Sequence, residues 1–333
     1  MNRSFVWNLA AIAAVALGTD TLGAQEKPSM VLAQTIALKG RPGKLDHLAL
    51  DAKTDRLFVA NKANNTLDIV DLKTGKLIQQ IGAQQGIQGI AFAADLDRIF
   101  VGLGQGGYCN IFNGQDLKLL KSVKFMDDSD NVRYHAKTHL VYVAHAENAL
   151  GVIDAKTFEV KADIKLPAMA EGFVLENARP RLYVNITSLS QVVQIDSDTN
   201  KITNTYPIKL AGANVPMAFD EPNHRIFLGC RKPPAVVVMD TETGKEVASV
   251  PIAADVDDLF FDAQRKKLYA ACGDGMISVV KQVSADKYEP GDKIATEKGA
   301  RTGLFDSESS RFFLAVPRQP GKDAAEVRVY KVQ

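Results

Sequence analysis

Short apolar runs alternate with polar turns along almost the whole chain, and they recur with a regular period. One phrase occurs seven times: aliphatic, aromatic and small residues that follow a basic residue in six copies, as in Arg56-Leu-Phe-Val-Ala and Arg225-Ile-Phe-Leu-Gly. Successive copies begin 41 to 44 residues apart. A period this regular indicates one supersecondary unit repeated along the chain.

Each repeat divides into four predicted strands joined by turns. In the first repeat the strands cover residues 48–51, 56–60, 67–71 and 76–81. The turn after the third strand begins with Asp71 and ends with Gly75, because Asp accepts backbone N–H bonds in turns and Gly tolerates positive φ. No segment of the repeats has a helical period, so the pattern predicts an all-β fold.

Four strands per repeat of just over 40 residues predict a seven-bladed β-propeller with four-stranded antiparallel blades. The last repeat has only three strands, because the chain stops at Gln333 after the strand at 327–332. Residues 32–38 precede the first repeat and have the character of a fourth strand. We therefore expect this N-terminal strand to complete the last blade and to remove the open sheet edge.

The repeat phrases resemble those of the secreted YVTN-type (YncE-like) seven-bladed β-propeller family. The resemblance rests on segments such as Arg181-Leu-Tyr-Val-Asn and Val141-Tyr-Val-Ala-His-Ala-Glu-Asn, and it covers about residues 31–333. The resemblance implies an exported bacterial protein that is a binding or surface protein of unknown activity. The phrases themselves are expected to pack between blades rather than to form a site.

Residues 1–24 have the layout of a secretory signal peptide: Arg3, an apolar run from Phe5 to Gly18, and small residues before Gln25. This predicts a periplasmic or secreted protein whose propeller occupies residues 25–333; an uncleaved anchor is the alternative. The apolar run is shorter than the roughly 20 residues that cross a bilayer, and no membrane span is expected.

The composition narrows the possible chemistry. The chain has 333 residues and a formal net charge of +1, which gives no indication of nucleic-acid binding. Its cysteines, Cys109, Cys230 and Cys272, contain no CxxC or CxxCH spacing, so neither a structural zinc nor a c-type haem is expected. Cys230 and Cys272 fall at equivalent repeat positions and are interpreted as buried packing residues, with a disulfide as the alternative.

Aligning the repeats gathers polar residues at one mouth of the central channel, where the first strand of each blade begins and the second ends. The predicted ligand-binding residues are Asp46, His47, Asp130, Asn131, Glu171, Asp257, Asp258, Arg301, Arg231 and Arg318. Converging carboxylates favour a bound cation or a basic ligand group. The candidate metal ligands are Asp46, Asn131, Glu171 and Asp257. The same side chains are alternatively only solvated or paired with Arg301.

The metal, if present, is expected to be Ca²⁺ or Mg²⁺ with oxygen ligands, or a transition metal if histidine takes part. His47 and His145 are the candidate general bases, because the alignment places both at the mouth. No GxSxG, HExxH or P-loop motif occurs.

The sequence therefore favours an exported monomer that binds a small molecule or an exported protein at this face, without demonstrable catalysis. One alternative is a metal-dependent hydrolase, lactonase or lyase that uses the acidic mouth. Another is a scaffold that docks a periplasmic redox partner.

Overall fold

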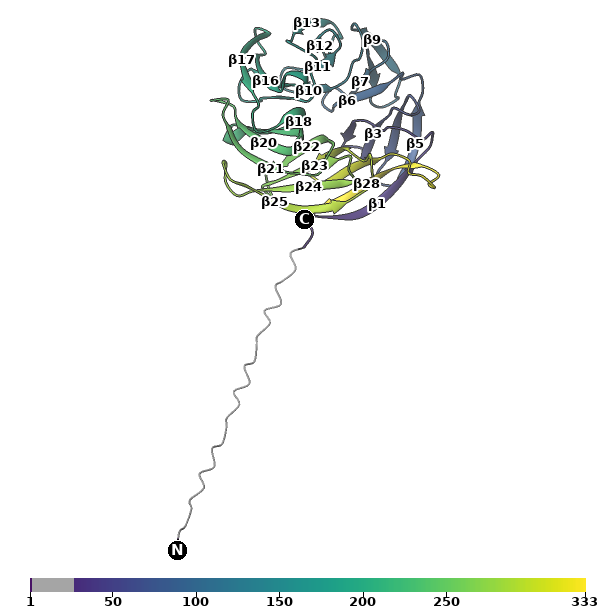
Figure 1. The fold of residues 1–333 in the computed structure, drawn as a ribbon. Helices are drawn as coiled ribbons and strands as arrows, with labels where there is room; N and C mark the ends of the chain where they lie inside the picture. The colour runs from purple at the N-terminus through teal and green to yellow at the C-terminus, as the bar shows by residue number, and fades with distance from the viewer. Residues whose placement is uncertain (2–26) are drawn as a thin grey trace.

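The computed structural model describes residue 1 and residues 27–333; apart from residue 1, the predicted signal peptide lies outside the described residues. Within 27–333, the strands form seven four-stranded antiparallel sheets around a common centre (Figure 1). This confirms the predicted all-β seven-bladed propeller. No helix in this part of the chain is long and apolar enough to cross a membrane.

The first four blades follow the chain in order. Blade one contains β2 (Leu48–Asp51), β3 (Arg56–Asn61), β4 (Thr66–Asp71) and β5 (Lys76–Ile81). Blade two contains β6 (Ile87–Ala93), β7 (Arg98–Leu103), β8 (Tyr108–Asn113) and β9 (Leu119–Lys124). Blade three contains β10 (Val132–His135), β11 (Leu140–His145), β12 (Ala149–Asp154) and β13 (Val160–Lys165). Blade four contains β14 (Phe173–Leu175), β15 (Arg181–Ile186), the 3₁₀ turn η1 (Thr187–Leu189), β16 (Gln191–Asp196) and β17 (Lys201–Pro207).

The last three blades complete the ring. Blade five contains β18 (Gly212–Asp220), the 3₁₀ turn η2 (Glu221–Asn223), β19 (Arg225–Lys232), β20 (Pro234–Asp240) and β21 (Glu246–Pro251). Blade six contains β22 (Val256–Asp262), β23 (Lys267–Cys272), β24 (Met276–Gln282) and β25 (Tyr288–Ala295). Blade seven contains β26 (Thr302–Asp306), β27 (Arg311–Val316), β28 (Ala325–Val332) and β1 (Met30–Leu38).

The position of a strand within its blade explains its composition. In β3, the second strand of blade one, every residue after Arg56 is buried, because neighbouring blades cover both faces of the sheet. In β9, the outermost strand of blade two, only Val123 is buried. Continuous apolar runs therefore mark the second and third strands, and polar residues mark the outermost ones.

Among the described residues, seven apolar clusters fill the seven interfaces between neighbouring blades. At the junction of blades seven and one, for example, Leu57 and Val59 pack with Ile36, Phe313 and Val327. Because each cluster draws on two blades, no blade buries its apolar faces alone.

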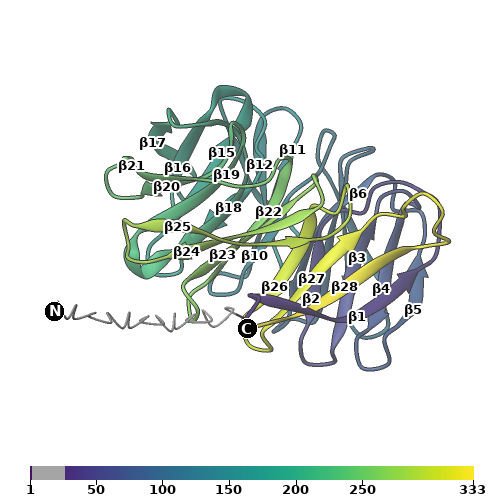
Figure 2. The same cartoon turned by 60° about the horizontal axis from the view of Figure 1, so that its bottom comes forward.

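The ring closes by pairing of the two ends of the described fold. Strand β1 pairs antiparallel with β28, from Met30 opposite Val332 to Leu38 opposite Ala325. Figure 2 shows β1 beside β28, β27 and β26 in one sheet. The predicted completion of the last blade by the N-terminal strand is confirmed.

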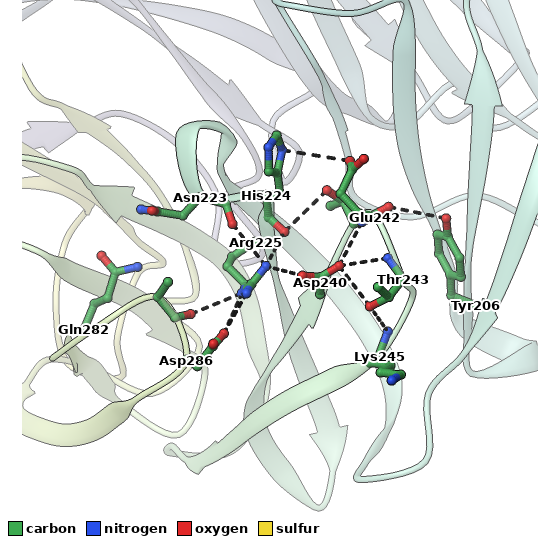
Figure 3. A network of polar contacts seen from close by, with 12 residues as sticks. Tyr206, Asn223, His224, Arg225, Asp240, Glu242, Thr243, Lys245, Gln282 and Asp286 are labelled. Atoms are coloured by element: carbon green, nitrogen blue, oxygen red, sulfur yellow. Dashed lines mark hydrogen bonds and ion pairs between the residues drawn. The ribbon is translucent and has the colours of Figure 1, made fainter.

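The basic residue that opens the repeat phrase ties neighbouring blades together on the face opposite the predicted mouth. Arg225 bonds Asp240 of its own blade and donates to Asp286 of blade six at 2.7 Å (Figure 3). Four residues make the same kind of crossing: Arg56 to Gly114, Arg181 to Glu242, Lys267 to Ser29, and Arg311 to Asp55. The basic residue of the repeat therefore links neighbouring blades.

Removing β1 should unfold the protein. Met30, Ile36 and Leu38 are at most 3% exposed, and burying three such side chains stabilises the fold by about 5–9 kcal/mol, comparable to the whole stability of many domains. We expect a chain that begins at Lys39 to be largely unfolded by circular dichroism, whereas one that begins at Gln25 melts cooperatively. Equal melting temperatures (Tm) would show that closure by β1 is unnecessary.

Candidate functional site

The first strands of the blades surround a central channel with a volume of about 1070 Å³. In Figure 1, β6, β10, β18 and β22 lie around the centre of the ring. At the mouth where the first strands begin, the channel is lined by charged side chains, and further in it is lined by apolar residues such as Phe92, Phe219 and Leu304. Where the first strands end, it is lined by Glu221, Asp306 and Glu308. We call the end where the first strands begin the upper mouth.

Nine of the ten predicted ligand-binding residues line this channel. They are Asp46, His47, Asp130, Asn131, Glu171, Asp257, Asp258, Arg301 and Arg231. Most lie just before the first strand of a blade, as the alignment predicted, but Asp257 and Asp258 lie within β22. The pairing of β22 with β23 shifts register between Val256 and Asp258. Such a bulge leaves Asp257 without a partner residue opposite it and can redirect its side chain toward the mouth.

His47 lies between two carboxylates. Its Nδ1 is 3.4 Å from Asp258 Oδ2 and its Nε2 is 3.9 Å from Asp46 Oδ1. Burial opposes the charged imidazole, but attraction to Asp258 and then Asp46 outweighs burial and nearby Arg133, raising the pKa of His47 to about 10. Asp258 also accepts a 2.9 Å bond from the backbone N–H of Gly303. His47 is therefore protonated at neutral pH, and a general base must be unprotonated.

Asp257 is held by two guanidinium groups. Arg301 Nε lies 2.9 Å from Asp257 Oδ2, and Arg231 bonds the other carboxylate oxygen. Both arginines also contact Asp255, with Arg301 Nη1 2.9 Å from its oxygens. Burial raises the pKa of Asp257, while the two arginines oppose that rise. Arg301 and Arg231 thus neutralise part of the acidic ring directly.

Asp130 and Glu171 are not held in this way. Within residues 27–333, no side-chain hydrogen bond or ion pair holds either carboxylate, although both are half-buried in the channel wall. Burial, and then the Asp46 carboxylate, raise the pKa of Asp130 to about 7. Burial and Asp257 raise the pKa of Glu171, with Arg231 opposing. These two carboxylates would gain most from a cationic ligand group.

The sequence interpretation missed Arg133, which lies inside β10 and lines the channel. Its guanidinium donates to Val132 O at 3.0 Å and to Asn131 Oδ1 at 3.1 Å, and stands 5.7 Å from the centre of the Phe173 ring. Burial lowers the pKa of Arg133, against the pull of Asp258 and Asp130. A signal was available: the equivalent residues of the other blades are all apolar, namely Ala49, Ala91, Val174, Ala218, Phe260 and Leu304.

The side chain of His145 does not line the channel, which corrects its expected placement. The ring is 2% exposed and stacks on Phe125 with 4.7 Å between ring centres. Its Nε2 lies 2.8 Å from Asp163 Oδ1, and its Nδ1 lies 2.6 Å from Ala146 O. Its place at the end of β11 was predicted correctly, but the side chain turns into the blade.

Arg318 also lies apart from the channel lining. It follows β27, and its Nε donates to Lys322 O at 2.8 Å within the same loop. Aligning the repeats could not locate this side chain, because the loop from 317 to 324 is longer than the loops that join the second and third strands of the other blades.

The candidate metal ligands Asp46, Asn131, Glu171 and Asp257 all line the channel. Among the residues that the structure describes, however, no group of three or more His, Cys, Asp or Glu side chains is arranged to hold a metal ion. The geometric reason at Asp257 is that Arg301 and Arg231 occupy its oxygens.

The three cysteines are buried and free. Burial raises the pKa of Cys109, Cys230 and Cys272 to about 12 each. The interpretation of Cys230 and Cys272 as packing residues is confirmed.

Comparison with known proteins supports the same architecture. No protein-family model matches the chain. A stretch of 151 residues is 26% identical to the uncharacterized protein YncE of Salmonella typhimurium, and covers 44% of this chain and 42% of that protein. Over this stretch the chain is similar to YncE. YncE of Salmonella typhi is 25% identical with the same coverage, and the matched region spans less than half the length of either relative.

Two solved structures illustrate the likeness in fold. The WD40 repeats of RRP9 superpose with a TM-score of 0.79 at 10% identity, covering 91% of this chain and 100% of that one. Hydrazine synthase of Kuenenia stuttgartiensis gives a TM-score of 0.72 at 15% identity, covering 84% and 94%. At these identities the likeness concerns the propeller fold alone. The similarity to YncE confirms the predicted resemblance at a distant level.

The raised pKa of His47 predicts how stability depends on pH. A histidine whose pKa is raised on folding stabilises the native state fully below its unfolded pKa of 6.5, and this contribution is lost as pH rises to about 10. We expect His47→Gln to lower Tm most at pH 6 and progressively less toward pH 10. His224→Gln, on the opposite face with its side chain 44% exposed, is the control. A Tm deficit in His47→Gln that does not change with pH would contradict the assigned ion pairs.

Proposed function

We propose that this protein is an exported binding protein that holds a small polar molecule at the upper mouth of its central channel. The observation that carries the proposal is the convergence of nine predicted site residues on one channel of about 1070 Å³. Pockets that bind small molecules combine an apolar wall with a few convergent polar groups, as this channel does.

The repeat architecture supports binding at this place. The apolar residues of the repeat are buried between neighbouring blades, so most of them cannot contact a ligand. The charged residues of the channel differ from blade to blade. Arg133 has apolar equivalents in all other blades, and the repeat position of Glu171 is acidic in four blades but is Gln88, Val215 and Arg301 in the other three. An asymmetric arrangement of charges on a symmetric scaffold suits recognition of one asymmetric molecule.

The hydrolase alternative receives less support from the geometry. His47 is held in its protonated form between Asp46 and Asp258, and His145 is buried away from the channel. Neither candidate base is therefore placed to accept a proton from a molecule in the channel.

Binding can be tested by ligand-observed NMR with a library of small polar molecules that includes cations, anions, zwitterions, neutral compounds and Ca²⁺. We expect at least one class to bind the wild type and to lose at least tenfold in affinity in the double variant Asp130→Asn, Glu171→Gln. The control is Glu289→Gln, an exposed carboxylate on β25. If no compound binds, or if the double variant binds like the wild type, this channel is not the binding site.

Export is tested separately. We expect the mature chain purified from its native cell to begin near Gln25, because the small residues before it provide a cleavage site. Intact-mass measurement of the secreted or periplasmic fraction checks this. A full-length chain confined to the cytoplasm would refute export and leave the proposal for the channel unaffected.

A further inference from the structure

The charged side chains of the upper mouth divide into those that satisfy one another and those that do not. Arg231 and Arg301 are paired with Asp255 and Asp257. His47 is paired with Asp46 and Asp258. Lys62 lies 3.7 Å from Asp46 and also bonds Gln88, which donates to Asp128 at 2.8 Å. Of the half-buried charged side chains that line this mouth, Asp130, Glu171 and Arg133 have no ion pair with any described residue; the exposed Lys44 at the rim of the channel has none either.

Arg133 is an available cation. A guanidinium carries five N–H donors, and the two bonds of Arg133 go to the neutral oxygens of Val132 and Asn131. No carboxylate of the part of the chain that the structure describes lies within ion-pair distance of Arg133, and its ring contact is with Phe173. Because the equivalent residues of the six other blades are apolar, the propeller does not need a cation at this position. Arginine presents its donors in a planar fork that matches a carboxylate.

Asp130 and Glu171 are available acceptors. Both carboxylates line the same channel as Arg133, from the segments that precede β10 and β14. Arg133 donates to Asn131, the residue that directly follows Asp130, so Arg133 and Asp130 are close neighbours in the channel wall that Glu171 also lines. A half-buried pair of carboxylates with no partner favours an ammonium group between them.

Building on the proposed function, we propose that the channel ligand is a small amino acid or related zwitterion, with its ammonium group on Asp130 and Glu171 and its carboxylate on Arg133. A bare divalent cation would use the two carboxylates but would leave Arg133 without an anion. A simple carboxylic acid would use Arg133 alone. The zwitterion is the ligand class that satisfies all three groups.

The test is isothermal titration calorimetry with wild-type protein and ligands that differ only in charge and length. The zwitterions are glycine, β-alanine, 4-aminobutyrate and 6-aminohexanoate; the single-charge controls are butylamine and butyrate, and Ca²⁺ represents a bare cation. We expect at least one zwitterion to bind at least tenfold more tightly than every control. The chain length that binds best reports the separation of the carboxylate site from the ammonium site.

Variants assign the two ends of the ligand. Arg133→Met keeps an unbranched apolar stem but removes the charged guanidinium group, and should weaken zwitterion binding by about 10- to 100-fold while leaving butylamine unchanged. Glu171→Gln should weaken zwitterion and butylamine binding together. Arg133→Lys keeps the charge and should retain part of the affinity, and an unchanged Tm shows that each variant is folded. Glu289→Gln should bind every ligand as the wild type does.

The outcomes separate this inference from the proposed function. If butylamine or Ca²⁺ binds as tightly as every zwitterion, or if Arg133→Met binds zwitterions normally, the inference is wrong and the channel remains a binding site of another class. If some other member of the wider library binds in the channel and no zwitterion does, the inference is again wrong. If no compound of any class binds, the proposed function fails as well.

Discussion

The pairing of β1 with β28 is the constraint on which the rest of the structure depends. A propeller blade buries its faces only against its neighbours, so an open array would expose two apolar faces and an unpaired strand edge. By supplying the fourth strand of blade seven, β1 connects the first and last blades of the fold. Closure also fixes the channel, because the seven inner strands face a common axis only when the ring is complete.

Two kinds of contact between blades recur around the ring, and they occupy different depths. The apolar clusters fill the interior of each interface. On the face opposite the upper mouth, the basic residue of the repeat crosses from one blade to the next, as Arg225 does to Asp286 and Arg311 does to Asp55. These ion pairs are partly exposed and individually weak, so they align the blades more than they stabilise them. Because these repeated ion pairs lie on the opposite face, the charged residues of the upper mouth are not needed for them.

The upper mouth concentrates charge of both signs in a half-buried space. Burying charges is unfavourable unless they are paired, and most of these groups are: His47 with two carboxylates, and Asp257 with two guanidinium groups. Such a network holds its side chains in defined positions. Asp130, Glu171 and Arg133 stand within this network without an ion pair to any described residue, which distinguishes them as groups that a ligand can satisfy.

The sequence by itself determined the blade count, the strand order, the closure by the N-terminal strand and the location of nine residues that line the channel. These features follow from period and alternation, and side-chain periodicity is a local property that each repeat displays independently. It could not determine the direction of individual side chains: His145 ends the predicted strand but turns inward onto Phe125, whereas Arg133 lies inside a strand and reaches the channel. Nor could it determine which charges pair, because the partners Asp257, Arg231 and Arg301 come from different segments of the chain. Only the tertiary structure decided these points, since they depend on the bulge in β22 and on packing between blades rather than on spacing along the sequence.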